Sequence, residues 1–423
     1  MPMTTHTLKV RELPYELPSY SLTGDILGYL RCGLQYRYSR LGKMPSRSPV
    51  QLWFGNFIHG CMDEGFRTYH REILAGADHP TALSRVDPER VIQTIEARLE
   101  AQGLEAWEPW TKVLGYARAR VALSDLADLL FPLISQSEVR LTGARPLATL
   151  PPSDLFRRAD RYEMAGVIDV VSHIEMSRPE VASNPVVQKV RGTLGKLPAN
   201  FEIIIDYKGS RRPPKPATAP KKGAAPSLWD QYNWQILTYS DLRQRQPGSH
   251  QAIAGFVIYL NELLPLETDL EKLEDDLKAP GLVVDEPVSS ADLSAWRKKA
   301  RATERTARAT LNAGGKGSEL LASKDLVASP VPWAVRLRRA LRLVPVFQKD
   351  LEGANQQFDQ VVYQIECCRG REFHKGQILG VWTMNPSDHQ TCAPCDVRTW
   401  CPSFAAKWNH GRKGAPELPR KKV

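Results

Sequence analysis

The sequence predicts an α/β fold with a mixed central sheet flanked by helices. Two apolar segments are typical of buried strands: FEIII, which opens the stretch 201–210, and the continuous run AIAGFVIYL at 252–260. A third strand is expected at 164–171. Apolar residues recur at helical spacing in the segments 52–74 and 228–243. Strands interspersed with helices favour a sheet covered by helices.

Length and composition limit the class of protein. A chain of 423 residues can form two or three ordinary domains or one elaborated domain. The 57 Lys and Arg against 47 Asp and Glu leave a formal charge of +10, which suits a polyanion such as nucleic acid, although many basic proteins bind none. No apolar run approaches the ~18 residues of a membrane span, and the N-terminus has no signal-like apolar region, so we expect a cytoplasmic, soluble protein without a membrane partner.

Changes of composition along the chain indicate five regions. They are an N-terminal helical region (1–135), a core with strands (136–265), an inserted basic helical subdomain (266–345), a C-terminal helix with a cysteine segment (346–405) and a basic tail (406–423). Within the core, residues 174–200 are expected to be a long polar connection.

A basic loop is expected at 211–226, which is rich in Pro, Lys, Arg and Ala and holds no acidic residue. Mobile basic loops often contact phosphates, and a merely solvated linker is the alternative. The candidate nucleic-acid contacts in it are Arg211, Arg212, Lys221 and Lys222.

The strand within 201–210 ends in Asp206-Tyr207-Lys208. Because strand side chains alternate between faces, Asp206 and Lys208 are expected on the same face, opposite Tyr207. A carboxylate beside an ammonium can hold a divalent cation together with a water or a phosphate. The alternative is a surface ion pair that ends a buried strand.

Other polar residues are placed where they could join this pair. Asp169 lies near the end of the predicted strand 164–171, with a turn-forming role as the alternative. His59 follows Gly55 by four residues on a predicted helix, so that both share a face and the glycine lets another backbone approach; a structural histidine is the alternative. Three residues at i, i+4 and i+8 share a face of the helix 228–243, where ordinary packing is the alternative: Gln231, Gln235 and Tyr239.

Four cysteines form a candidate metal site. TCAPCDVRTWCP holds Cys392, Cys395 and Cys401 in a C-x2-C-x5-C pattern, and Cys32 lies in a comparably polar setting near the other end of the chain. Zinc and a [4Fe–4S] cluster both accept four thiolates, so spacing does not choose between them, and unliganded thiols are the alternative. The remaining cysteines lie in apolar, helix-like contexts and are expected to be buried packing thiols: Cys61, Cys367 and Cys368.

Taken in order, four short motifs resemble those of the RecB/AddB-type branch of the PD-(D/E)XK nuclease superfamily. They are Gly55-x-x-x-His59, Gly166-Val-Ile-Asp169, Asp206-Tyr-Lys208 and Gln235-x-x-x-Tyr239. One Cys upstream and a Cys trio downstream are similar to the iron–sulfur members, such as AddB-type nuclease domains and CRISPR-associated exonucleases of RecB type. The resemblance covers about residues 20–405. The family's usual Glu in the third motif is replaced by the shorter Asp206, and the segments 174–200, 211–226 and 266–343 match nothing in it.

The resemblance implies a restriction-endonuclease-like core with a helical cap that an iron–sulfur cluster ties together, joining the two ends of the chain. It implies Mg²⁺ or Mn²⁺ bound by Asp169, Asp206, His59 and the Tyr207 carbonyl. Lys208 would orient the attacking water or stabilise developing charge, and Gln235 and Tyr239 would position the phosphate. Two residues are expected at the edge of this site, as extra or indirect metal groups: Glu138 and Gln231. The cluster held by Cys32, Cys392, Cys395 and Cys401 would be a structural [4Fe–4S] group rather than zinc.

The function expected from these residues is metal-dependent DNA cleavage, as an exonuclease on single strands or DNA ends. Without a G-x-x-x-x-G-K-[ST] loop the chain is not expected to hydrolyse ATP, so any helicase or any defence or recombination complex would be a separate partner. One alternative is a non-cleaving nucleic-acid-binding subunit of a helicase, CRISPR-adaptation or defence complex. Another is a zinc-stapled DNA-binding protein with structural carboxylates.

Overall fold

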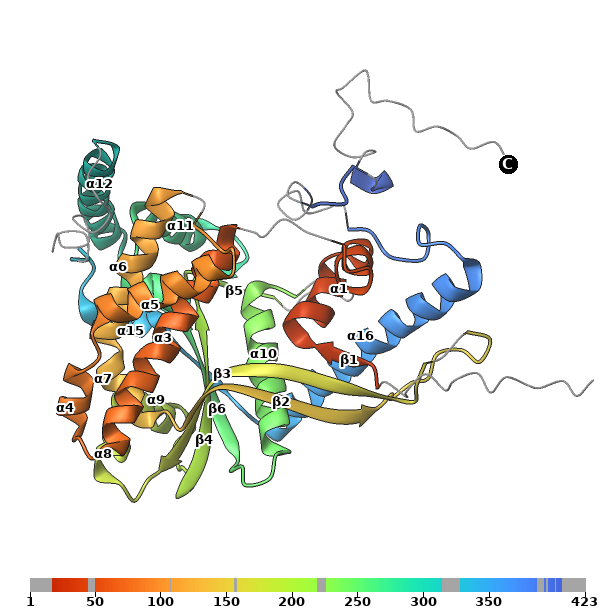
Figure 1. Cartoon of the computed structure of the whole chain (residues 1–423), viewed down its shortest axis with the longest axis horizontal. Helices are drawn as coiled ribbons and strands as arrows, with labels where there is room; N and C mark the ends of the chain where they lie inside the picture. The colour runs from red at the N-terminus through yellow and green to blue at the C-terminus, as the bar shows by residue number, and fades with distance from the viewer. Residues whose placement is uncertain are drawn as a thin grey trace, which may run out of the picture. The chain divides into compact units, whose positions relative to one another are not determined.

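The computed structural model describes residues 17–44, 50–106, 108–155, 158–218, 226–313, 328–385, 392, 395–399 and 401–404 (Figure 1). The predicted basic tail, 406–423, lies outside these residues. The chain divides into two compact units. Unit 1 consists of residues 1–47, 142–165 and 355–423, and unit 2 consists of residues 48–141 and 166–354.

Unit 2 is built on a mixed sheet flanked by helices, which confirms the predicted α/β class. Its strands follow the order β3-β4-β6-β8, and β2 also pairs with β3. The β3–β4 and β6–β8 pairs are antiparallel, whereas the β4–β6 pair is parallel. The strands are β2 (Gln136–Pro146), β3 (Arg161–Glu175), β4 (Asn200–Lys208), β6 (Ala252–Tyr259) and β8 (Leu341–Pro345).

One face of this sheet packs on a layer of helices. The strand residues Ile203, Ile205 and Tyr207 share a buried cluster with apolar side chains of these helices, among them Phe57 and Ile92. Asp78 and Asp87 cap two of the helices with side-chain hydrogen bonds, and a proline follows each within the first two helical positions. The layer comprises α3 (Val50–Leu74), α4 (His79–Ser84), α5 (Pro88–Ala101), α6 (Pro109–Asp125), α7 (Ala127–Leu130) and η3 (Phe131–Leu133).

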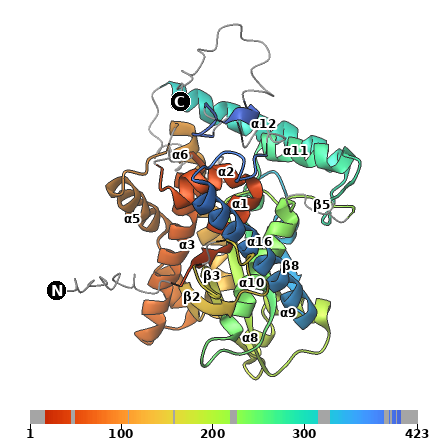
Figure 2. The same ribbon diagram turned by 90° about the vertical axis from the view of Figure 1, so that its right-hand side faces the viewer.

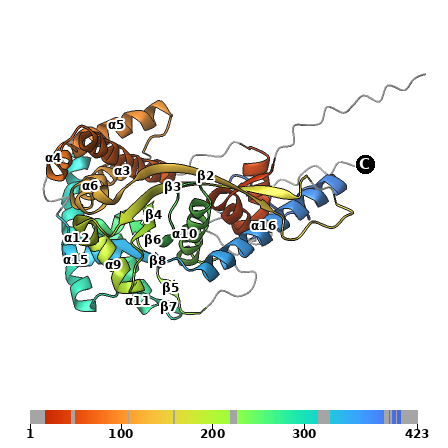
Figure 3. The same ribbon diagram turned by 90° about the horizontal axis from the view of Figure 1, so that it is seen from below.

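The other face of the sheet is covered by α10 (Leu228–Gln244), the crossover that a parallel β4–β6 pair requires (Figure 3). Ser227 caps its start by accepting a hydrogen bond from the Asp230 amide at 3.2 Å. Near its end, Arg243 makes two 2.8 Å hydrogen bonds to the buried Glu202 of β4. A buried ion pair of this kind is costly to break because one charge would remain unpaired. The Arg243–Glu202 pair ties the end of α10 to β4.

Residues 174–200 differ from the polar connection that was predicted. The strand β3 continues to Glu175, and two helices follow, α8 (Pro179–Ala182) and α9 (Pro185–Leu194). Asn184 caps α9 by accepting a hydrogen bond from the Val186 amide at 2.9 Å, and Val186, Val187 and Val190 are buried. Only three valines form the buried face of α9. Because polar residues surround them, the segment shows little helical periodicity in its sequence.

The region 266–345 contains helices, as predicted, but also strand. It holds α11 (Glu267–Lys278), α12 (Ser290–Asn312) and α15 (Trp333–Ala340). A short strand, β7 (Leu282–Val283), pairs with β5 (Lys215–Pro216). Strand β8 at its end pairs with β6, so the last residues of the region belong to the central sheet.

Unit 1 joins residues from both ends of the chain (Figure 2). Residues 355–375 of α16 (Gln348–Lys375) contact the N-terminal elements through Tyr20, whose hydroxyl donates to Glu366, and through Arg37, which donates to Glu372 at 2.5–2.6 Å. The N-terminal elements are β1 (Ser19–Ser21), which pairs with the start of β3, η1 (Leu22–Ile26), α1 (Leu27–Arg31), α2 (Gly33–Tyr36) and η2 (Arg37–Leu41).

Among the helices within the described residues, none combines the length and the apolar character that a membrane crossing needs.

Candidate functional site

Three potential metal ligands converge in unit 2. One ligand atom each from His59 on α3, Glu138 on β2 and Asp169 on β3 lies within 4.8 Å of the others, and no other such group occurs among the described residues. His59 Nδ1 lies 3.3 Å from Asp169 Oδ2. The His59 and Asp169 side chains are 28% and 11% exposed, and Glu138 is exposed, so the group is reachable from solvent. An imidazole with two carboxylates is a suitable donor set for Mn²⁺ and, with more oxygen ligands, for Mg²⁺.

Glu138 is held in an uncommon backbone conformation. Its φ is +52°, in the left-handed region that non-glycine residues rarely adopt. Such strain persists where surrounding structure enforces it, and it is concentrated at functional sites. Although the residue as a whole is exposed, partial burial of its carboxyl group, followed by the charges of Asp169 and Asp63, raises the pKa of Glu138 above its ordinary value. A cation bound beside Asp169 would relieve this repulsion.

Asp169 is positioned by the Tyr207 amide and by His59. The Tyr207 amide donates a hydrogen bond to Asp169 Oδ2 at 2.7 Å, which ties the carboxylate to β4. Burial alone would raise the pKa of Asp169, but His59, Lys208 and this amide outweigh it, so the pKa lies below its ordinary value. The same pairing keeps the His59 pKa above its ordinary value despite burial. Asp169 is therefore ionised at neutral pH and available to a cation.

A second group of polar residues continues from Asp206 across to α10. Lys208 Nζ lies 2.6 Å from Asp206 Oδ2 and donates to Gln235 Oε1 at 3.0 Å. Gln235 Nε2 donates to Asp206 Oδ1 at 2.8 Å and to the Tyr239 hydroxyl at 3.1 Å. The predicted shared faces of β4 and α10 thus meet in one hydrogen-bonded network.

The electrostatics of this network favour an added cation. Burial raises the pKa of Asp206 to about 6 against the opposing effect of Lys208, and the charge of Asp169 adds to the rise. Burial lowers the pKa of Lys208, but Asp206 and Asp169 outweigh it and leave a net increase, so the ammonium is charged at neutral pH. Burial likewise raises the pKa of Tyr239, which keeps its hydroxyl protonated. The charges of Asp206 and Asp169 repel each other across this network, and a divalent ion bound beside them would reduce that repulsion.

Two glycines permit the close packing around the site. A Cβ at Gly166 would lie 2.8 Å from Cε1 of Tyr239, and a Cβ at Gly209 would lie 2.9 Å from Cε1 of Phe54. Another backbone does approach Gly55, as predicted, since a Cβ at Gly209 would lie 3.9 Å from the Gly55 Cα. A Cβ at Gly55 itself would meet no atom within 4 Å, so this approach does not require a glycine at position 55.

Several predicted residues lie elsewhere. Gln231 donates to the Pro226 carbonyl at 2.7 Å instead of joining the network. Arg211 is ion-paired with Asp276. Arg212 is 5% exposed, donates from its backbone amide to the Glu262 carboxylate at 2.8 Å and pairs with Asp285. These two arginines thus bind acidic groups of the chain itself, and the other two candidates of the basic loop lie outside the described residues: Lys221 and Lys222.

Two residues at the site were not predicted. Asp63 lies one helical turn after His59 on α3, lines the same pocket as Glu138 and Asp169, and pairs with Arg67 at 2.9 Å. The i, i+4 spacing from His59 was the available signal. The ring of Tyr232 lies 5.1 Å from Lys208 Nζ in a cation–π arrangement, and nothing in the sequence pointed to this contact.

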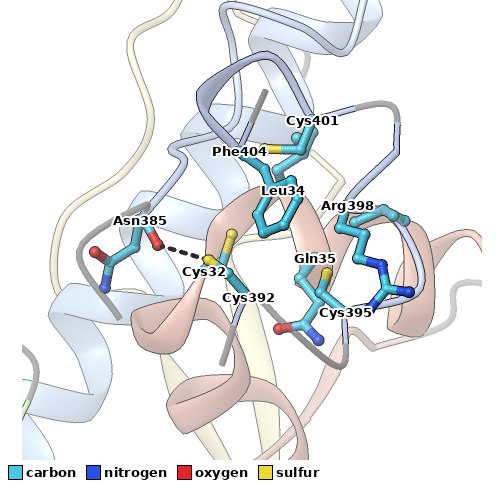
Figure 4. A pocket seen from close by; sticks show the side chains of 10 residues that line it. Cys32, Leu34, Gln35, Asn385, Cys392, Cys395, Arg398, Cys401 and Phe404 are labelled. Carbon is cyan, nitrogen blue, oxygen red and sulfur yellow. Dashed lines mark hydrogen bonds between the residues drawn. The ribbon is translucent and has the colours of Figure 1, made fainter. Parts of the chain in front are cut away.

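The four candidate cluster cysteines line one pocket in unit 1 (Figure 4). Cys32 occupies the break between α1 and α2, where its backbone is extended (φ −165°, ψ 111°). The Cys395 amide donates to the Cys392 carbonyl at 3.1 Å, which holds these two residues close together. Burial, with smaller contributions from the other three thiols, raises the pKa of Cys395. The remaining cysteines are buried, as predicted: Cys61, Cys367 and Cys368.

Comparison with known proteins assigns no family. The sequence matches no family model and no curated protein.

Proposed function

We propose that the protein is a cytoplasmic metal-dependent nuclease of the RecB/AddB-type branch of the PD-(D/E)XK superfamily, with a restriction-endonuclease-like core. Its substrate would be DNA, cut from single strands or ends. The observation that carries the proposal is the convergence of His59, Glu138 and Asp169 beside the network of Asp206 and Lys208. Their elements are far apart in the sequence and come together only through the fold.

The donor set fits a hard or borderline divalent cation. His59, Glu138 and Asp169 would hold Mn²⁺ or Mg²⁺, and Asp206 lies in the adjoining network, where burial, together with the charge of Asp169, raises its pKa. Such an ion would supply Lewis-acid stabilisation of charge on a scissile phosphate. The exposure of Glu138 leaves a route for a phosphodiester to reach the group.

Lys208 is the residue best suited to act on the reacting phosphate. Its ammonium is fixed by Asp206, Gln235 and the Tyr232 ring, so it needs no reorganisation to meet developing negative charge. Gln235 holds both members of the Asp206–Lys208 pair, and the Tyr239 hydroxyl extends the network. Lys208 would orient an attacking water or stabilise the negative charge, and Gln235 and Tyr239 would keep it in place.

We also propose that Cys32, Cys392, Cys395 and Cys401 hold a structural [4Fe–4S] cluster. A tetrahedral zinc ion with Zn–S bonds of ~2.3 Å needs sulfur atoms about 3.8 Å apart. Among the described residues, no three of these thiols meet the 4.8 Å separation that the His59 group meets, and the resemblance to the iron–sulfur nucleases favours the larger [4Fe–4S] group over zinc. Hydrolysis needs no electron transfer, which favours a role in joining residues 1–47 to residues 355–423 of unit 1.

The test of the nuclease proposal is incubation with end-labelled single- and double-stranded DNA in Mn²⁺, Mg²⁺ or EDTA. We expect cleavage with metal and none in EDTA. Asp206→Ala and Lys208→Ala should lower the rate by about 10²–10³-fold, because each removes a group that meets charge in the transition state.

Lys299→Ala is the matched control for Lys208→Ala, since Lys299 is exposed on α12. It should cleave like the wild type. Metal-dependent DNA binding without cleavage would favour the alternative of a non-cleaving nucleic-acid-binding subunit. Equal cleavage by the wild type and both site variants would reject the proposed site.

A further inference from the structure

Unit 1 contains a pocket whose lining includes neither the candidate metal ligands nor the candidate cluster cysteines. Its volume is about 510 Å³, within the range of ~300–1,000 Å³ typical of small-ligand sites. Three arginines, two glutamates and one aromatic ring characterise its lining: Arg37, Arg158, Arg369, Glu366, Glu372 and Phe373. A lining of this kind is suited to a ligand that is both anionic and aromatic.

Two of the arginines are held in place by the glutamates. Arg37 donates to Glu372 through Nε at 2.6 Å and Nη2 at 2.5 Å. Arg158 donates to Glu366 through Nε at 3.3 Å and to the Tyr20 hydroxyl through Nη2 at 2.9 Å. The Nη1 group of each guanidinium takes no part in these bonds. A guanidinium that is already ordered loses little conformational entropy when it binds a phosphate.

The third arginine, Arg369, also faces Glu372, because its charge adds to that of Arg37 in lowering the pKa of this carboxyl. It precedes Phe373 by four residues on α16, so the two side chains share a helix face. Phe373 is 70% exposed at the pocket, an unusual position for a large apolar ring. A cation and an exposed aromatic ring side by side are the usual means of binding a phosphate together with its base.

We infer that this pocket binds one nucleotide of a single-stranded nucleic acid, with its phosphate on the arginines and its base stacked on Phe373. Three arginines against two glutamates leave a single positive charge, which matches one phosphodiester rather than a polyphosphate. A base within a duplex is covered on both faces by its neighbours and could not reach Phe373, so the pocket would select single strands.

The inference rests on the proposed nuclease function. It adds a second site, which binds the nucleic-acid strand without cleaving it. The two can fail separately, because strand binding is measurable without cleavage. The protein used is the full chain carrying Asp206→Asn, in EDTA, with a fluorescein-labelled 12-nucleotide oligothymidylate as the probe for fluorescence anisotropy.

Arg369→Gln should weaken binding of the labelled strand about tenfold, as expected for the loss of a charged hydrogen bond to phosphate. Phe373→Ala should weaken it by a similar factor and Phe373→Trp should restore it, because stacking needs only an aromatic face. Arg371→Gln is the matched control: Arg371 is exposed on the same helix outside the pocket lining, and its loss should change affinity less than twofold. Equal effects of Arg369→Gln and Arg371→Gln would overturn the inference.

Competition and crosslinking identify the ligand. Thymidine monophosphate should displace the labelled strand at lower concentration than inorganic phosphate at equal ionic strength, and equal displacement would reject the stacked base. An oligonucleotide with 5-iodouracil should crosslink to the segment of α16 that contains Phe373, which mass spectrometry can locate without any variant. Crosslinks confined to unit 2, or displacement by an acidic peptide as readily as by the nucleotide, would refute the proposed occupant.

Discussion

Replacing Asp206 by asparagine should stabilise the metal-free protein while it weakens the response to metal. Asp206 is 2% exposed, and burial raises its pKa from 3.8 to about 6. A carboxyl whose pKa is higher in the folded state than in the unfolded state binds its proton more tightly when folded. Its ionisation therefore costs stability, and asparagine resembles the protonated form without that cost.

The magnitude follows from the two pKa values. The difference between 3.8 and about 6, at ~1.36 kcal/mol per pH unit, corresponds to about 3 kcal/mol at pH 7. The direction of the pKa shift determines the pH range over which the stabilities of the two proteins differ. Below pH 3.8 the carboxyl is protonated in both states and the variant should match the wild type. As the pH rises from about 4 to 6, the wild type should lose this stability relative to the variant, and above pH 6 the difference should be constant.

The assay is denaturant unfolding in EDTA at a series of pH values, followed by the same measurement with Mn²⁺. Mn²⁺ should stabilise the wild type and reverse the order of the two proteins, because a cation favours the ionised carboxylate that asparagine cannot form. Asp275→Asn, at an exposed aspartate of α11, is the matched control and should leave stability unchanged at pH 7. A variant less stable than the wild type in EDTA at pH 7, or stabilised equally by Mn²⁺, would refute the reasoning.

Three further predictions concern the supporting residues. Gly166→Ala should lower the free energy of unfolding by about 1–3 kcal/mol and slow cleavage, because the new Cβ would lie 2.8 Å from the Tyr239 ring. Gly55→Ala is the control and should bind Mn²⁺ normally, because a Cβ there has open space around it. Equal defects in the two variants would contradict the packing argument. Glu138→Gln should weaken Mn²⁺ binding about tenfold in calorimetry, and unchanged affinity would exclude it as a ligand. Cys395→Ser should abolish absorbance near ~400 nm and lower the melting temperature while Mn²⁺ binding persists; unchanged absorbance and stability would reject the cluster.

Sequence patterns were sufficient to predict which side chains share a face within each element. Alternation along β4 placed Asp206 and Lys208 on one face, and the helical period placed Gln235 and Tyr239 on one face of α10. Apolar runs identified β4 and β6 as buried strands. Each relation is local to one strand or helix, a range over which backbone geometry alone dictates where side chains point.

Tertiary packing decided how these faces meet. The meeting of His59 on α3 with Glu138 on β2 and Asp169 on β3 depends on how α3 lies against the sheet, which no local pattern encodes. Arg212 is a basic-loop residue by sequence, yet the fold buries it against Glu262 and Asp285. The burial of many apolar side chains at once sets the distances between elements that are far apart in the chain. Most residues of the site could therefore be predicted one by one from the sequence, but the complete set could not.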